Sequence, residues 1–291
     1  MDIDPDDLRA LSHVSDTSLL TLFGRAGDSR TGGAIRDPIA EHLADALQPV
    51  LAQSDRPLHQ RLARGQLSSA HCTYMGLRAR HFDDEALDFL ARQAEGFVVN
   101  MGCGFDSRWD RLRARVDDPA RLLVFDVDLP AVIELKRRVF AVEPGYRLIA
   151  ADVTDPSWLD ALPSERPAIV LAEGLLMYLD PDAVRALVLA LRERIPSCEL
   201  VAEVFARRWL EGWRGRVLDR KLERGFDMDA DARFRFGVHD GRDLEAWADG
   251  IEVVGEWSLF DERSPRLRGM NWMRHFDGLR RLQWVVHWRL G

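Results

Sequence analysis

The sequence predicts an α/β fold, in which a mostly parallel β-sheet is covered by helices on both faces. Two observations lead to this prediction. From residue 96 onward, short apolar runs of strand length alternate with segments of helical periodicity. Before residue 96, apolar side chains recur at helical spacing, as in Ile39, Leu43 and Leu47. Repetition of strand, helix and strand is typical of a doubly wound sheet.

The region before residue 96 is expected to form a helical N-terminal cap, residues 1–95. Helical spacing of apolar side chains occurs again at Ala86, Leu87, Phe89 and Leu90. The turn-rich stretch AGDSRTGG breaks the pattern between the helical segments. These patterns indicate several helices that are joined by turns.

Residues 96–291 are expected to form the sheet-containing core. The candidate strands are FVVNM, RLLVFDVD, YRLIAAD, AIVLAEG, CELVAEVF, IEVVGEW and LQWVVHWRL. The segment 206–235 is rich in arginine, tryptophan and acidic residues, and it interrupts the alternation of strands and helices. We expect it to be an inserted lid, in which Trp209 and Trp213 are candidates for contact with a substrate.

Composition narrows the classes of function. A chain of 291 residues, 46% of them hydrophobic, can bury a substantial core. A net charge of −8 argues against a non-specific nucleic-acid binder, so a small-molecule or peptide partner is expected. The N-terminus MDIDPDD is acidic and no apolar run could span a bilayer, which predicts a cytoplasmic protein without membrane contact. The three cysteines show no CxxC pair, and no metal site is predicted.

The motif VVNMGCGFDSR leads from the first candidate strand into a helix. Gly102 and Gly104 let the backbone approach a ligand closely, but Ser107 stands where a dinucleotide-binding turn has its third glycine. Asp106, at the start of the helix, opposes the binding of a pyrophosphate there. The turn therefore favours a cofactor without phosphate groups over NAD or FAD. The alternative is a turn that only packs a strand against its helix.

Acidic residues follow three further strands. The ligand of a doubly wound sheet lies at the carboxyl ends of the strands. Asp128 follows the second strand, in the position where an acid accepts hydrogen bonds from ribose hydroxyls. Asp152, beside Val153, follows the third strand, and Glu173 follows the fourth. Three carboxylates around a glycine turn favour hydroxyls, an amine and a positive charge, and these groups predict S-adenosyl-L-methionine as the cofactor.

Four blocks of the sequence carry a resemblance to a known family. They are VVNMGCGFDSR, FDVDLPAVIELKRR, AADVTDPSWLDAL and AEGLLMYLDPDAVRALV. Together they resemble the leucine carboxyl methyltransferase family, and especially its bacterial branch of polyketide-type O-methyltransferases. The upstream segments VSDTSLLTLFGRA and LRARHFDDEALDFLA fit the same branch. The resemblance implies a class I methyltransferase with a Rossmann-like, seven-stranded sheet whose last strand is antiparallel.

The resemblance also implies which residues bind the methionine end of the methyl donor. Arg78, in the LRAR block, matches the arginine that binds the carboxylate of the donor. Arg25 is a second candidate for that contact. Gly102 and Gly104 would line the methionine end, and Glu173 would contact the same portion of the donor.

The remaining implied contacts involve the adenosine and the acceptor. Asp128 matches the ribose-binding acid, and Asp126, on the same strand face, is a second candidate. Asp152 and Val153 match the pair that brackets adenine. Tyr178 matches a tyrosine near the acceptor, which it would help to position. The alternative for Tyr178 is a core aromatic residue at the start of a helix.

The sequence and the resemblance together predict a methyltransferase that esterifies a carboxylate of a natural product or peptide. A carboxylate is ionised at neutral pH, so its methylation needs no general base. Two alternatives stay open. The same fold could methylate another oxygen, nitrogen or carbon of a specialised metabolite or ribosomally made modified peptide, with His239 or a lid residue recruited as a base. Alternatively, the chain could bind the donor without catalysing a reaction.

Overall fold

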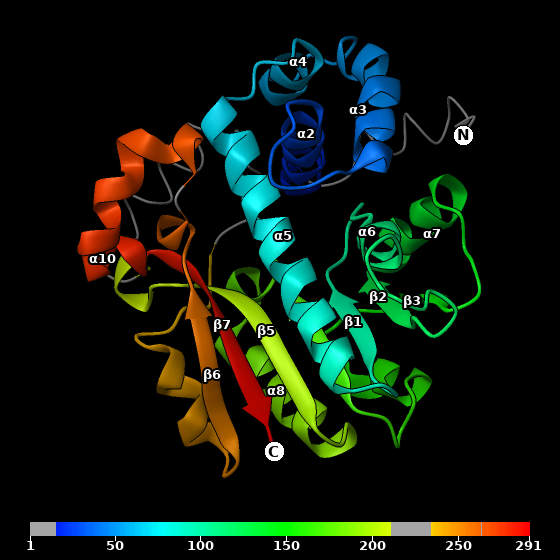
Figure 1. The fold of residues 1–291 in the computed structure, drawn as a ribbon, viewed down its shortest axis with the longest axis vertical. Helices are drawn as coiled ribbons and strands as arrows, with labels where there is room; N and C mark the ends of the chain where they lie inside the picture. Colours follow the sequence, from blue (N-terminus) through cyan, green and yellow to red (C-terminus); the bar gives the residue numbers. More distant parts are fainter. Residues whose placement is uncertain (1–15, 211–233, 263) are drawn as a thin grey trace.

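A seven-stranded sheet forms the centre of the computed structural model, which describes residues 16–210, 234–262 and 264–291 (Figure 1). The strand order is β3-β2-β1-β4-β5-β7-β6. β7 runs antiparallel to both β5 and β6, and the other neighbouring strands are parallel. The strands are β1 (Phe97–Met101), β2 (Val124–Asp128), β3 (Tyr146–Ala150), β4 (Ala168–Ala172), β5 (Cys198–Phe205), β6 (Ile251–Trp257) and β7 (Gln283–Leu290). The predicted sheet with an antiparallel last strand is confirmed.

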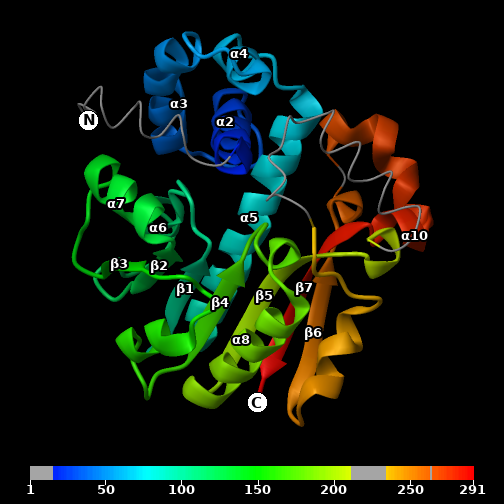
Figure 2. The same cartoon turned by 180° about the vertical axis from the view of Figure 1, so that it is seen from behind.

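The central strands are buried on both faces, which explains why they are continuous apolar runs in the sequence. Every residue of β1, β4 and β5 is buried. On one face, α8 (Pro181–Arg194) packs its buried leucine and valine side chains against these strands. On the other face, α5 (Ser69–Arg92) and α6 (Arg108–Arg113) cover the sheet (Figures 1 and 2). α7 (Pro130–Val139) joins β2 to β3.

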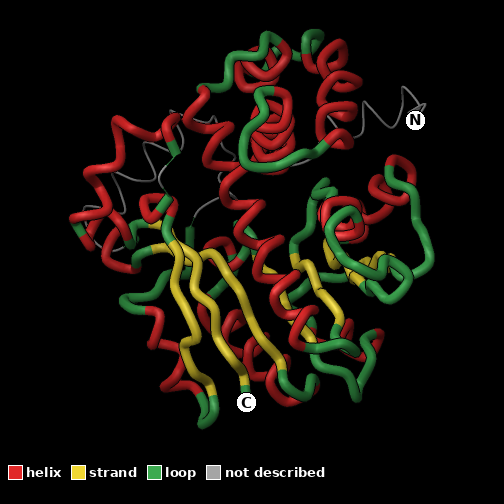
Figure 3. Tube along the Cα trace, viewed as in Figure 1, coloured by secondary structure: helices red, strands yellow, loops and turns green. Residues whose placement is uncertain are grey.

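The described part of the N-terminal region, from residue 16 onward, is helical, as the sequence predicts. α2 (Asp16–Arg30), α3 (Pro38–Leu51) and α4 (Pro57–Ala63) share one hydrophobic cluster. α3 begins at Pro38, and the carboxylate of Asp37 caps it by accepting a hydrogen bond from the backbone of Ala40 at 2.9 Å. α5 runs from this cluster down across the sheet (Figure 3). Phe82, Ala86 and Phe89 of α5 therefore belong to the core of the sheet rather than to the cap.

The predicted lid, residues 206–235, lies mostly outside the described residues, which exclude 211–233 and so Trp213. Its two flanks meet at the end of β5, where Ala206 forms a bridge with Val238. The backbone N–H of Arg235 donates to the carbonyl of Met177 at 2.7 Å. Trp209 packs against the core of the sheet. Both ends of the segment are thus anchored at the carboxyl edge of the sheet.

Short helices complete the described fold. They are η1 (Pro156–Ala161), η2 (Leu176–Tyr178), η3 (Arg207–Trp209), η5 (Gly241–Trp247), η6 (Leu259–Asp261), η7 (Pro265–His275) and α10 (Asp277–Arg280). η2 follows β4 directly and brings its residues to the carboxyl edge of the sheet. None of the helices in the described ranges has the length and apolar character needed to cross a membrane.

Candidate functional site

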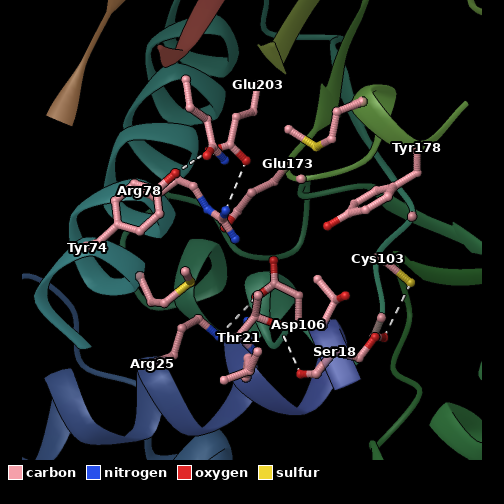
Figure 4. A pocket seen from close by; sticks show the side chains of 18 of the residues that line it. Ser18, Thr21, Arg25, Tyr74, Arg78, Cys103, Asp106, Glu173, Tyr178 and Glu203 are labelled. Atoms are coloured by element: carbon pink, nitrogen blue, oxygen red, sulfur yellow. Dashed lines mark hydrogen bonds and ion pairs between the residues drawn. The ribbon is translucent and has the colours of Figure 1, made fainter. Parts of the chain in front are cut away.

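A pocket of about 360 Å³ lies at the carboxyl ends of β1, β4 and β5, where α2 and α5 close it (Figure 4). Its volume lies within the range of small-molecule sites. Seven of the residues singled out from the sequence line it: Arg25, Arg78, Gly102, Gly104, Asp106, Glu173 and Tyr178. The structure therefore brings together the side chains that were implied for the methionine end of the donor and for the acceptor.

The glycine turn after β1 is held in a conformation that glycine adopts readily. Gly102 has φ +61° and Gly104 has φ +48°, both in the left-handed region. A Cβ atom on Gly102 would lie 2.8 Å from Cδ1 of Leu175, which is too close for a side chain. The backbone of the turn can therefore line the pocket without side chains filling it.

Asp128 supports this turn from the end of β2. Its carboxylate accepts a hydrogen bond from the backbone N–H of Gly104 at 2.7 Å and another from Leu129 at 2.7 Å. Burial raises the pKa of Asp128, and these two hydrogen bonds oppose that effect. Asp128 lies beside the glycine turn, although it is not among the residues that line the pocket. Its proposed contact with ribose stays a prediction.

Asp126 is enclosed in the protein interior. Its side chain is 0% exposed, and Nζ of Lys136 lies 2.6 Å from its carboxylate. It also accepts hydrogen bonds from the hydroxyl of Tyr146 at 2.5 Å and from the amide of Asn100 at 3.1 Å. Asp126 on β2 therefore links β1 and β3, and its carboxylate is enclosed by the side chains of Lys136, Tyr146 and Asn100.

Asp152 and Val153 follow β3, outside the lining of the pocket. Asp152 is exposed, and its carboxylate accepts hydrogen bonds from the backbone and the hydroxyl of Thr154 at 2.9 and 2.7 Å. Val153 is buried in the core beneath the sheet. The assignment of this pair to adenine also stays a prediction.

Arg78 is clamped between two carboxylates. Its Nε lies 2.8 Å from Glu173 and its Nη1 lies 2.9 Å from Glu203. Glu203, at the end of β5, also accepts hydrogen bonds from the hydroxyl of Tyr74 at 2.5 Å and from the amide of Gln283 at 2.8 Å. Figure 4 shows Arg78, Glu173 and Glu203 converging on one side of the pocket. Helix α5, β4, β5 and β7 are therefore joined at this point.

A buried network of ion pairs extends from this clamp below the glycine turn. Arg108 binds Glu173 at 2.5 Å and Asp83 at 3.0 Å. Arg111 binds Asp83 at 2.7 Å and Asp106 at 2.8 Å. The network continues to α2 and α3 through Asp37, which lies 3.1 Å from Arg111 and 3.2 Å from Arg25.

The network fixes the charge state of Glu173 and Asp106. Burial disfavours the ionised form of Glu173, but Arg78 and Arg108 outweigh burial and lower the pKa of this carboxyl. In the same way, Arg108 and Arg111 overcome burial and hold the pKa of Asp106 well below its ordinary value. These acids are therefore ionised at neutral pH, and they accept protons poorly.

Tyr178 and His71 are two lining side chains that could exchange a proton with a ligand. The hydroxyl of Tyr178 points into the pocket in Figure 4, and its ring meets Phe234 edge-on with the centroids 5.3 Å apart. Burial raises the pKa of Tyr178 and lowers the pKa of His71. His239 lies in a different cavity, beside Arg281. Within the described ranges, no group of three potential metal ligands is placed to hold a metal ion.

Among the lining residues that the sequence reasoning missed, Glu203, Tyr74 and Gln283 surround Arg78. Glu203 had a detectable signal, because it is an acid near the end of a strand that is otherwise mostly apolar. Tyr74 lies one helical turn before Arg78 and so shares its face of α5. Gln283 begins β7, far from the other motifs, and no local pattern marks it.

Sequence comparisons agree with this geometry. Residues 18–191 match the leucine carboxyl methyltransferase family. The chain is 31% identical to the tetracenomycin polyketide synthesis O-methyltransferase TcmP of Streptomyces glaucescens, over 86% of this chain and 85% of the relative. It is 33% identical to the S-adenosyl-L-methionine-dependent methyltransferase dpfgK of Gibberella zeae, over 61% of this chain and 60% of that protein.

Solved structures share the fold. A DUF574 family protein from Streptomyces avermitilis superposes with a TM-score of 0.54 at 18% identity, covering 83% of this chain and 95% of its own. A Thermobifida fusca protein assigned as a methyltransferase superposes with a TM-score of 0.52 at 18% identity, covering 91% and 93%. The sheet order and the family match agree. This chain belongs to the leucine carboxyl methyltransferase family and is an S-adenosyl-L-methionine-dependent methyltransferase.

Proposed function

We propose that the protein transfers the methyl group of S-adenosyl-L-methionine to a carboxylate oxygen of a natural product or peptide, and that both substrates meet in the pocket described above. The observation that carries this proposal is the set of buried, ionised side chains around the pocket, which can hold charged groups but take up protons poorly. A carboxylate is the acceptor that suits such a site, because it reacts without losing a proton.

The residues of the pocket fit the amino-acid end of the donor. Arg78 and Arg25 are placed to attract its carboxylate, and Glu173 is placed to attract its ammonium group. The turn at Gly102 and Gly104 leaves room for the backbone to contact the same portion. The adenosine would then extend past Asp128 toward the ends of β2 and β3.

The bound donor supplies an electrophilic methyl carbon on a positively charged sulfur. A lone pair of the acceptor oxygen forms the new O–C bond while the C–S bond breaks, and the bonding pair of electrons stays on sulfur. No proton is transferred when the acceptor is a carboxylate. The work of the protein is therefore to align the two groups and to exclude water, which can lower a barrier by several kcal/mol, up to about 7 to 11.

The acceptor side of the pocket is apolar and aromatic. We assign to it the lining residues Met177, Tyr178 and Phe234, of which the last two meet edge-on. Aromatic and thioether side chains of this kind pack well against flat, apolar ligands. The name of the Streptomyces glaucescens relative links that protein to polyketide synthesis. These two facts support an aromatic carboxylic acid as the acceptor.

A second candidate acceptor is a hydroxyl group, and His71 favours it. This histidine lines the pocket, and burial lowers its pKa, so the ring is neutral at physiological pH. A neutral imidazole can accept a proton from a phenol as the methyl group is transferred. O-methylation of a phenol would then depend on His71, whereas methylation of a carboxylate would not.

A matched pair of acceptors separates the two candidates. The protein is incubated with methyl-labelled donor and either anthraquinone-2-carboxylic acid or 2-hydroxyanthraquinone, and each product is then treated with mild alkali. Labelling of the acid with release of labelled methanol supports a methyl ester. Labelling of the hydroxy compound alone, or a label that survives alkali, would rule out the carboxylate assignment.

A further inference from the structure

The buried charges around the pocket do not balance. Within the part of the chain that the structure describes, the ion-pair network contains one more carboxylate than guanidinium groups. Its acids are Asp37, Asp83, Asp106, Glu173 and Glu203, and its bases are Arg25, Arg78, Arg108 and Arg111. The most exposed of these side chains, that of Glu173, is 11% exposed. Solvent therefore screens the excess negative charge weakly.

The excess charge is located at Glu203. Each of the other four acids contacts at least two arginines of the network. Among the arginines that the structure describes, Glu203 forms an ion pair with Arg78 alone, and Glu173 shares that arginine. The two further donors to Glu203, Tyr74 and Gln283, are neutral groups. The hydrogen bonds of Glu203 are sufficient for its burial. Its positive partner, however, is an arginine that it shares with Glu173.

This carboxylate faces the pocket. Glu203 is among the lining residues, and its side chain is 2% exposed. A Cβ atom on Gly174 would lie 3.6 Å from its Oε2, which places the carboxylate beside the backbone that follows Glu173. Figure 4 shows Glu203 next to Glu173 and across the pocket from Tyr178. A ligand that fills the pocket would thus lie next to an under-compensated negative charge.

A buried charge without its own partner is costly, and a ligand of opposite charge offsets that cost. S-adenosyl-L-methionine carries a carboxylate, an ammonium and a sulfonium, so its net charge is +1. The demethylated product has a neutral thioether in place of the sulfonium, so its net charge is zero. The donor therefore carries one positive charge more than the product, and a positive charge is what would compensate Glu203.

We infer that Glu203 is a specificity-determining residue that makes the pocket select the positively charged methyl donor over its demethylated product. The inference rests on the proposal that the donor binds in this pocket. Loss of the sulfonium charge on methyl transfer removes the attraction to Glu203, so the product dissociates more readily than the donor.

Two stable ligands test this inference without turnover. Sinefungin carries an amine where the donor carries its sulfonium-bound methyl group, and S-adenosylhomocysteine is the neutral product. We expect calorimetry to show that sinefungin binds the native protein about tenfold more tightly than S-adenosylhomocysteine, since a unit charge near a buried carboxylate is worth at least that factor. In the Glu203→Gln variant, the two dissociation constants should become nearly equal.

Glu199→Gln is the matched control, because Glu199 is another buried, ion-paired acid of β5. Its partners are Arg92 and His287, and it does not line the pocket. This variant should keep the tenfold preference. If Glu203→Gln does not fold, Gln283→Lys provides a second variant, since the amide of Gln283 lies 2.8 Å from Glu203 and a lysine there supplies the missing countercharge. That variant should also lose the preference.

The outcomes separate the inference from the proposal on which it rests. Equal affinities in the native protein, or a preference that persists in Glu203→Gln, would overturn the role of Glu203 and leave the donor pocket in place. Failure of both ligands to bind the native protein would overturn the pocket assignment and the inference with it. A preference that vanishes in Glu199→Gln as well would show a general stability effect and would also contradict the inference.

Discussion

Arg78 and Glu173 bind each other across 2.8 Å, although one projects from α5 and the other follows β4. The family resemblance implies that each of them contacts the methyl donor. In the structure, they form one unit that joins the helical region to the sheet. A substitution at either position therefore affects both the pocket and the packing of the two regions against each other.

Replacing Arg78 by methionine should weaken both stability and binding. The change leaves Glu203 without its arginine and Glu173 with Arg108 alone, and breaking a buried ion pair costs about 3–5 kcal/mol. Urea unfolding measures that loss, and calorimetry with S-adenosylhomocysteine measures the loss of affinity. Arg78→Lys is the control, because lysine keeps the positive charge but lacks the forked guanidinium group. Its stability and affinity should lie between those of the native protein and of Arg78→Met. Unchanged affinity in Arg78→Met would contradict the donor assignment.

Asp128 should make two separate contributions, one to the stability of the glycine turn and one to the binding of the ligand. S-adenosyl-L-methionine or its product should raise the Tm of the native protein, and Asp128→Ala should remove most of that shift. Asp128→Asn keeps an oxygen that can accept the N–H of Gly104, so it should retain more stability in the absence of ligand than Asp128→Ala. A full ligand-induced shift in Asp128→Ala would show that this carboxylate does not bind the donor.

The turn after β1 should tolerate no side chain at Gly102. Gly102→Ala places a methyl group 2.8 Å from Leu175 at φ +61°, and such strain costs about 1–3 kcal/mol. Gly255→Ala is a matched control, since a Cβ atom there would have nothing within 4 Å. Denaturant unfolding should show a clearly lower free energy of unfolding for Gly102→Ala. For Gly255→Ala, the free energy of unfolding should change by no more than about 0.5 kcal/mol. Equal losses would refute the steric argument.

His287, which contacts Glu85 of α5 outside the lining of the pocket, should make stability depend on pH. Burial disfavours its charged form, but Glu199 and Glu85, each at 2.9 Å, raise the pKa of His287 from 6.5 to about 9. Because the pKa is higher in the folded state, this contribution is complete below pH 6.5 and disappears as the pH rises through 9. The lost stability should be on the order of 3 kcal/mol.

Urea unfolding of the native protein and of His287→Gln, at pH 6.5 and at pH 9, checks this expectation. The native protein should be less stable at the higher pH. The variant should show a smaller difference, because it has no group that titrates at this position. A pH dependence of the same size in both proteins would assign the effect to other groups.

The sheet and the glycine turn could be predicted from the sequence because both depend on local patterns. Buried parallel strands are continuous apolar runs, and the turn is marked by Gly102 and Gly104 within one motif. The partners of Arg78 could not be predicted in the same way. Glu203 lies 125 residues away along the chain, and its contact with Arg78 depends on how β5 is placed against α5.

The burial of the ion-pair network could also not be predicted from sequence patterns. Arg108 and Arg111 look like surface residues of a short helix, yet both are buried. They are buried because Asp83 of α5 and Asp106 of the turn supply their countercharges. Whether a charged side chain faces solvent or the interior is decided by such distant partners, which the sequence alone does not pair.

The course of α5 limits how this enzyme can be divided or recombined. One end of the helix supplies Tyr74 and Arg78 to the pocket, and the other end covers the sheet with Phe82 and Phe89. A fragment that starts after residue 95 lacks α5. It would expose the apolar face of the sheet that α5 covers, and it should aggregate. Chimaeras with relatives of different acceptor preference therefore need their crossover ahead of α5, so that the helix and the sheet it covers are inherited together.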